Sequence, residues 1–215
     1  MRAARVFSLV AAASLAAQGC AGGRDARAPL PRGVRENLLA NPGFEAGDEG
    51  WSYPVESPDW GRFEVVESPV HDGRRAAHLR LRAGPEDLSS ARHVLGVMQE
   101  LRGERLPDVF GGFYRVEAWR NGDDATRLYL QAVAIAWTPE AAALALPQGP
   151  QLPLGNLQLR YYLAGLREPP FVLANAKGIL VTREAPEPGR WISFELPLRE
   201  GFARQWGRVP ARCER

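Results

Sequence analysis

The segment 37–51 constrains the fold of this chain more than any other stretch. It reads NLLANPGFEAGDEGW, in which two leucines begin an extended run and Asn-Pro-Gly follows them. Proline fixes its own φ and glycine accepts a positive φ, so this tripeptide turns the chain sharply. Phe44 and Trp51 supply apolar anchors on either side of two further glycines. A strand, a corner and two aromatic anchors in so short a space indicate short strands around an apolar interior.

The rest of the chain repeats this pattern. Short alternating apolar segments are separated by Gly, Pro, Asn and Asp, and almost no stretch has a helical period. We expect strands at residues 62–68, 76–82, 94–101, 112–120, 127–137, 157–163, 178–183 and 191–198. The proline-rich segment 138–156 is expected to be a long loop. Roughly 180 residues can bury about 70% of their unfolded surface, so the sequence predicts one all-β sandwich that needs no metal or disulfide framework.

The N-terminus has the pattern of an export leader. Two arginines precede an apolar stretch over residues 6–17, which is too short to span a bilayer. Cys20 follows, in a setting that resembles the lipobox of bacterial lipoproteins, where the cysteine becomes the lipidated first residue. We therefore expect a signal peptide over residues 1–20 and a flexible tether over 21–36, which is rich in Gly, Pro and charge. The expected location is the bacterial cell envelope, lipid-anchored at the outer membrane or cell surface, and ordinary secretion is the alternative.

The cysteine count links the two ends of the chain. If Cys20 carries a lipid, Cys213 has no partner and is a free thiol. The alternative is a disulfide between these two residues in an oxidising compartment.

The motif at residues 37–51 resembles the opening of carbohydrate-binding modules of families four, nine and twenty-two, whose signature is N-L-L-x-N-P-G-F-E-x-G…W. Further blocks that are similar to the family lie at residues 71–81, 99–101, 113–119 and 189–196. The resemblance implies a jelly-roll β-sandwich of the galactose-binding-like type. The family's last strand has no counterpart before Arg215. We therefore expect that strand to be missing, or the gene product to be truncated, and one sheet edge to be open to pairing with another chain.

A structural calcium ion is common in these modules. Its ligands are backbone carbonyls, the glutamate of the Phe-Glu pair and an aspartate of the last strand. Glu45 corresponds to the glutamate, and no aspartate partner occurs before Arg215. The resemblance thus implies an incomplete oxygen shell at best, and we expect no required cofactor.

Composition and motifs argue against two classes of function. The chain has 27 basic and 25 acidic residues, a formal net charge of +2, and the charges are scattered. Without a basic stripe, nucleic acid is not expected as a partner. No Gly-x-Ser-x-Gly, His-Glu-x-x-His or phosphate loop occurs, and the three histidines lack metal-ligand spacing. We expect no catalytic residue, and any associated activity would be glycosyl-bond hydrolysis.

The alternation of two predicted strands defines a candidate sugar-binding surface. In residues 112–120 and 127–137, one parity is apolar and faces the core, and the other carries polar and aromatic side chains. The side chains on the outward parity are Arg115, Glu117, Trp119, Tyr129 and Gln131. If the two strands are antiparallel neighbours, these five lie on one surface. The alternative is a second layer of the protein that covers the same face.

Such a surface suits a pyranose. The apolar C–H faces of a sugar stack on aromatic rings, and its hydroxyl groups bond to amides, carboxylates and guanidinium groups. The family resemblance adds Gln99 near the groove, and Trp60 lies in a loop that could reach the ligand. The predicted partner is a polysaccharide or glycoconjugate, with the membrane contacted through the lipid anchor only.

The sequence therefore predicts non-catalytic carbohydrate binding by an envelope-anchored module, strengthened by the presence of many tethered copies. Two alternatives stay open. One is an accessory module of a glycoside hydrolase whose catalytic part lies elsewhere. The other is a structural envelope lipoprotein that uses the same sheet face to contact a protein.

Overall fold

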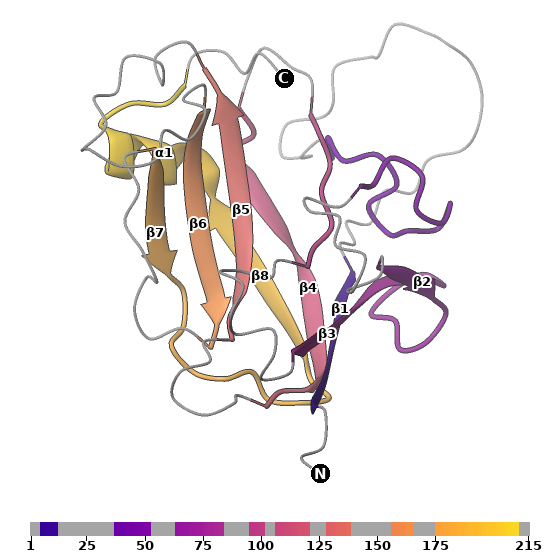
Figure 1. Ribbon diagram of the computed structural model, residues 1–215. Coiled ribbons are helices and arrows are strands. Elements are labelled where there is room, and N and C mark those ends of the chain that lie inside the picture. Colours follow the sequence, from indigo (N-terminus) through magenta and orange to yellow (C-terminus); the bar gives the residue numbers. More distant parts are fainter. Residues whose placement is uncertain are drawn as a thin grey trace, which may run out of the picture.

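The computed structural model describes residues 37–52, 63–83, 95–101, 106–120, 128–138, 156–165 and 175–210, and the backbone of residues 5–12. The elements within these residues are β1 (Arg5–Ala12), β2 (Glu64–Val66), β3 (Ala76–Ala83), β4 (Val109–Ala118), β5 (Leu130–Trp137), β6 (Asn156–Ala164), β7 (Ala176–Leu180), β8 (Trp191–Pro197) and α1 (Leu198–Trp206). Figure 1 shows that strands dominate and that α1 lies beside them. The prediction of an all-β chain is confirmed, with one short helix added.

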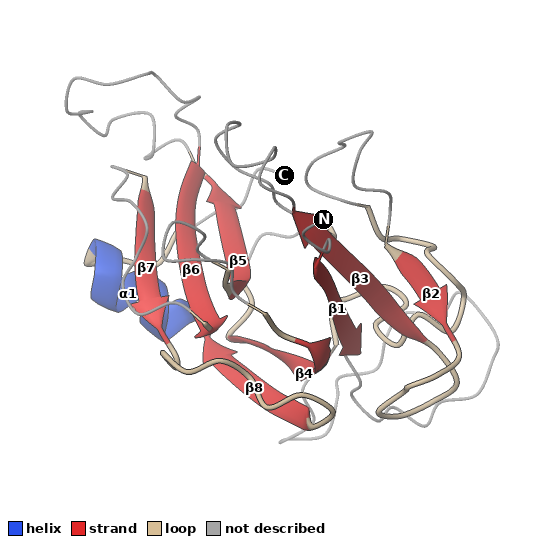
Figure 2. Cartoon of the chain, turned by 60° about the horizontal axis from the view of Figure 1, so that its bottom comes forward, coloured by secondary structure: helices blue, strands red, loops and turns tan. Residues whose placement is uncertain are grey.

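The strands form two sheets. A five-stranded sheet has the order β2-β3-β1-β4-β8, and a three-stranded sheet has the order β5-β6-β7. All neighbours in the larger sheet are antiparallel, whereas β6 pairs with β7 in parallel. In Figure 2 the larger sheet bends, so that β8 and β4 lie below the three-stranded sheet and β1, β3 and β2 rise beside it.

The main core lies between the three-stranded sheet, β4 and β8, with α1 closing one side. Alternate residues of β6 point into it, because successive side chains of a strand face opposite sides. The buried members from β6, β4 and α1 include Leu157, Leu159, Tyr161, Leu163, Tyr114, Val116, Leu198 and Phe202. The period of two that the sequence shows at residues 157–163 is therefore the pattern that attaches this sheet to the rest of the fold.

The motif at residues 37–51 builds a second, smaller core against β3. Phe44 is buried beside Ala77 and Leu79, and its ring stacks on Trp51 with centroids 4.9 Å apart. Asn41 holds the corner, because its side-chain amide donates to the carbonyls of two loop residues at 2.9 and 3.0 Å and accepts from Ala46 N at 3.0 Å. The two aromatic residues of the motif thus act as the anchors that the sequence predicts.

Several predicted elements differ from the structure. Residues 95–101, part of the predicted strand 94–101, contain only an isolated bridge between Met98 and Ser52. Most of the predicted loop 138–156 lies outside the described residues. The largest difference is at the N-terminus, where β1 belongs to the predicted leader and lies in the middle of the five-stranded sheet. Removal of residues 1–20 stays a prediction, as does the tether over 21–36, which lies outside the described part.

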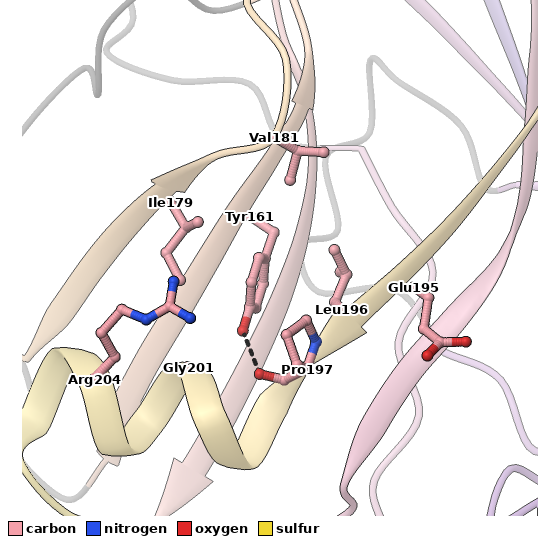
Figure 3. Close-up of a pocket in the computed structure, with 8 residues that line it drawn as sticks. All are labelled: Tyr161, Ile179, Val181, Glu195, Leu196, Pro197, Gly201 and Arg204. Carbon is pink, nitrogen blue, oxygen red and sulfur yellow. Dashed lines mark hydrogen bonds between the residues drawn. The ribbon is translucent and has the colours of Figure 1, made fainter.

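The helix α1 was missed because its sequence, LREGFARQW, is short and contains a central glycine. It ends at Gly207, whose φ of 70° is the left-handed conformation that commonly terminates helices. Gly201 is buried where α1 crosses β6, and a β-carbon there would overlap the Tyr161 hydroxyl and lie 3.0 Å from Leu159 Cδ1. The hydroxyl donates to the Pro197 carbonyl at 3.2 Å (Figure 3). Glycine is therefore needed for the close approach of helix and sheet.

We expect Gly201→Ala to destabilise the protein by about 1 kcal/mol or more. Overpacking costs roughly 1–3 kcal/mol, which outweighs the gain of up to about 1 kcal/mol in helix propensity. Chemical denaturation measures the change. Tyr161→Phe removes the atom that the new methyl group meets, so the double variant should lose less than the sum of the single variants. Additive losses, or a stabilised single variant, would show that the helix does not pack as described.

Candidate functional site

Trp119 does not lie on the outward face of β4, so this part of the predicted surface is wrong. The pairing of β1 with β4 skips one residue, since Ser8 pairs with Ala118 and Leu9 with Val116. This bulge at Glu117 shifts the alternation by one residue. The Trp119 ring then packs against the main core. Its benzo edge lies where a β-carbon would stand on Gly165, so a glycine makes room for it.

The predicted pairing of residues 112–120 with 127–137 is also wrong. β4 pairs with β1 and β8, whereas β5 pairs with β6 in the other sheet. The five residues predicted to share a surface are therefore divided. Tyr129 and Gln131 lie at the outer face of the three-stranded sheet, and Arg115 and Glu117 lie at the outer face of the five-stranded sheet.

The outer face of β6 carries a continuous row of polar side chains, which we call the β6 row. Its members are Asn156, Gln158, Arg160 and Tyr162, of which Gln158 and Arg160 are half-buried and Asn156 and Tyr162 are buried. Gln158 Nε2 donates to Asn156 Oδ1 at 2.8 Å, and Arg160 Nη2 donates to Gln158 Oε1 at 2.8 Å. Asn175, just before β7, donates to Asn156 Oδ1 at 3.2 Å. Each side chain thus fixes the next, and the guanidinium group is held over the middle of the sheet.

Residues from β5 border this row on one side. The Tyr129 ring meets Tyr162 edge-on, with centroids 5.4 Å apart. Gln131 lies opposite Tyr162, and its Oε1 is buried without a hydrogen-bond partner among the described residues. Val133 and Ile135 continue the same face and are 37% and 46% exposed. Amide, guanidinium and phenol groups therefore lie beside an exposed aliphatic strip.

On the β7 side, the row is open because a glycine lies beside it. Arg160 is in register with Gly178 of β7, which has no side chain and is exposed. Burial raises the pKa of Tyr162 above its usual value, and Tyr129 acts in the same direction. The phenol therefore stays protonated at neutral pH, and because Tyr162 is 1% exposed it lies inside the protein and not on the open face.

The β6 row is not among the predicted site residues, although the sequence contains a signal for it. Residues 156–163 read NLQLRYYL, with polar residues at every second position and apolar residues between them. The parity of this predicted strand places Asn156, Gln158, Arg160 and Tyr162 on one face.

The outer face of the five-stranded sheet is built differently. His71 stacks on Phe113 with ring centroids 3.6 Å apart and meets Trp191 edge-on at 5.4 Å. Arg115 Nε and Glu117 Oε1 form an ion pair at 2.9 Å. The Phe113 ring is covered by the histidine, and the guanidinium charge of Arg115 is neutralised by its neighbour.

Gln99 joins the corner of the first motif to the following segment. Its Oε1 accepts from Ala40 N at 2.7 Å, and its Nε2 donates to the carbonyls of Ala40 at 2.9 Å and Gly50 at 3.0 Å. Both amide hydrogens are thus used within the protein. This placement supports a structural part for Gln99, which the sequence placed near the ligand.

Glu45 holds the turn before β3. Its Oε1 accepts from the backbone of Arg74 at 2.7 Å and of Arg75 at 3.2 Å, and its Oε2 lies 3.5 Å from Arg74 Nε. The carboxylate that the family resemblance assigns to calcium is therefore engaged by N–H donors. No group of three or more His, Cys, Asp or Glu that could hold a metal ion occurs among the residues that the structure describes.

The remaining predicted site residues, Trp60 and Cys20, lie outside the described residues, as does Cys213. In the part of the chain that is described, no helix is long and apolar enough to cross a membrane. A small cavity of about 190 Å³ lies beside α1, at the edge where β7 and β8 approach (Figure 3). It is lined mainly by aliphatic groups, with Glu195 and Arg204 among its lining residues.

Comparisons with protein-family models, with curated proteins and with solved structures find no match. The resemblance to carbohydrate-binding modules therefore stays a prediction from the sequence motifs.

The hydrogen bonds and the ion pair of the Glu45 carboxylate predict that the stability of the fold depends on pH. The backbone donor of Arg74 chiefly holds the pKa of Glu45 below its usual value of 4.5. Desolvation opposes this shift, and the backbone donor of Arg75 and the Arg74 guanidinium add to it. The stabilisation is thus complete above the unfolded pKa and is lost as the pH falls through the folded one. The melting temperature of the wild type should exceed that of Glu45→Gln at pH ~7, with the difference shrinking toward pH ~3.

Glu49→Gln, an exposed carboxylate in the same loop, is the matched control. It should leave the melting temperature unchanged across this range. A Glu45→Gln difference that stayed constant down to the lowest pH would show that the charge of Glu45 has no part in holding the turn.

Gln99→Ala should lower the stability by about 1 kcal/mol or more, because it removes three hydrogen bonds between the corner and the segment 95–101. Thermal unfolding of this variant is compared with that of Glu100→Ala, an exposed neighbour. If Gln99 instead served a ligand, its removal would leave the melting temperature unchanged and weaken ligand binding alone.

Proposed function

We propose that this protein binds carbohydrate without catalysis, through the outer face of the three-stranded sheet. The β6 row carries the proposal, since its half-buried members Gln158 and Arg160 present donors and acceptors and are hydrogen-bonded to each other and to the buried Asn156. Networks of this kind keep polar groups in fixed positions before a ligand arrives. A ligand rich in hydroxyl groups can replace or extend those bonds at little cost in ordering.

The accessible part of the row suits a single sugar ring. Alternate residues of a strand are roughly 6.7 Å apart, so the half-buried pair Gln158 and Arg160 spans about that distance. Arg160 lies within the row, with Val133 opposite it on β5 and Gly178 on β7. A sugar ring can place its apolar face on the aliphatic strip of Val133 and Ile135 while its hydroxyl groups bond to the guanidinium and amide groups.

The outer face of the five-stranded sheet is the weaker candidate. Its aromatic rings stack on one another, as His71 does on Phe113, and its arginine is paired with Glu117. Binding there would first have to separate these groups. The finer parts of the proposal are a jelly-roll architecture, attachment to the bacterial envelope through Cys20, and a polysaccharide or glycoconjugate as the ligand.

Two matched arginine substitutions test the location of the site. Arg160 and Arg115 are both half-buried on outward sheet faces, and Arg→Met keeps the aliphatic stem while it removes the charge. We expect Arg160→Met to weaken binding at least about tenfold, since hydrogen bonds to charged groups contribute roughly 1.5–3 kcal/mol. Arg115→Met should leave binding unchanged. Retardation in gels that contain a polysaccharide found by glycan-array screening measures both.

Weakening by Arg115→Met alone would move the site to the five-stranded sheet. Absence of retardation by any polysaccharide would contradict carbohydrate binding, and hydrolysis of a bound glycan would contradict the non-catalytic role. Thermal unfolding of both variants confirms that each is folded before binding is compared.

A further inference from the structure

The strand β1 fills a slot between β3 and β4. It is antiparallel to both, pairing residues 5–11 with β3 and residues 8–12 with β4. Among the described strands, β3 and β4 do not pair with each other. Neighbouring strands lie about 4.8 Å apart, so without β1 these two would be about 10 Å apart, too far for backbone hydrogen bonds.

The floor of the slot is apolar on one parity. Positions 9 and 11 of β1 are in register with Leu79 and Ala77 of β3, and with Val116 and Tyr114 of β4. All four partners are buried. Position 7 is in register with Leu81. A strand in this slot therefore needs apolar residues at alternate positions, and the leader sequence RVFSLVAA has Phe7, Leu9 and Ala11 there.

The opposite parity has mostly polar partners. Position 8 is in register with the exposed Arg80 of β3 and with Ala118 of β4, and position 10 lies between His78 and Arg115. An occupant can therefore carry polar or acidic residues at these positions, although not at the three apolar ones. The slot thus specifies direction, register and side-chain pattern.

The sequence predicts that residues 1–20 are removed on export. Removal would leave the facing edges of β3 and β4 with unpaired backbone N–H and C=O groups and uncover the apolar residues below. The unpaired backbone groups and the uncovered apolar residues would both raise the free energy of the fold, and both favour pairing with a new strand. The tether sequence over 21–36 is a poor substitute, because it contains two prolines and several charges.

We propose that the slot between β3 and β4 is a binding site for an extended segment of another polypeptide. The partner segment runs antiparallel to both strands, has about eight residues and carries apolar side chains at three alternate positions. Main-chain hydrogen bonds supply affinity and the alternate apolar positions supply specificity, as in other cases of strand addition. The proposal rests on the predicted removal of the leader and is independent of carbohydrate binding.

The test uses the full chain with a protease site inserted between residues 21 and 36. The folded chain is cut and mixed with fluorescent peptides that span residues 3–14, and binding is followed by fluorescence anisotropy. The native peptide should displace the cut leader and bind. A Ser8→Asp peptide should bind about as well, because it places a carboxylate opposite Arg80. A Leu9→Asp peptide should bind at least about tenfold more weakly, because it buries an unpaired charge.

Three results would overturn the proposal. Equal binding of the two aspartate peptides would show that the register does not decide occupancy. Release of the leader without a change in melting temperature, and without peptide uptake, would show that the sheet closes by itself. Exported protein whose intact mass still includes residues 5–12 would show that the chain keeps its own strand in the slot.

A second copy of the chain is the remaining occupant, and it has its own signature. Exported protein that forms dimers in sedimentation, dissociated by the native peptide and not by the Leu9→Asp peptide, would assign the slot to self-association and contradict a different partner. Polysaccharide gels run on the same cut sample keep the two proposals apart, since sugar retardation should persist whether or not a peptide occupies the slot.

Discussion

The alternation of β6 is the constraint on which the rest of the structure depends. One parity of this strand supplies leucine and tyrosine side chains that attach the three-stranded sheet to β4, β8 and α1. The other parity forms the β6 row, in which Gln158 and Arg160 are half-exposed. Because a slip of one residue would exchange the two faces, the packing of the core and the presentation of the polar row are fixed by the same event. The candidate site is thus a by-product of core formation, and it needs no loop to position it.

Small departures from regular geometry decide the rest of the surface. The bulge at Glu117 turns Trp119 into the core, where Gly165 makes room for its ring. Gly201 lets α1 approach Tyr161, which closes the open end of the same core. Hydrogen bonds of Gln99 and of Glu45 hold the first motif against the segments that follow it. These features pack Trp119 and Tyr161 against the core and engage the polar groups of Gln99 and Glu45 within the protein.

The sequence analysis predicted the all-β class, the aromatic anchors Phe44 and Trp51, and the outward parity of Arg115 and Gln131. It could not predict that β5 leaves the sheet of β4, because strand pairing depends on contacts between residues far apart in the chain. It also missed the polar row, although the alternation at residues 156–163 was readable. The sequence did not predict helix α1, because a nine-residue segment with a central glycine has little intrinsic helix propensity.

The sequence by itself determined where the chain turns, which residues alternate and which aromatic rings must find an interior, because these follow from backbone stereochemistry and side-chain polarity at neighbouring positions. Only the tertiary structure decided which strands meet, so that Trp119 is packed against the core, Gln158 and Arg160 stay half-exposed and residues 5–12 lie between β3 and β4. Those outcomes arise from a competition among long-range pairings for a limited apolar interior. No local pattern encodes its result.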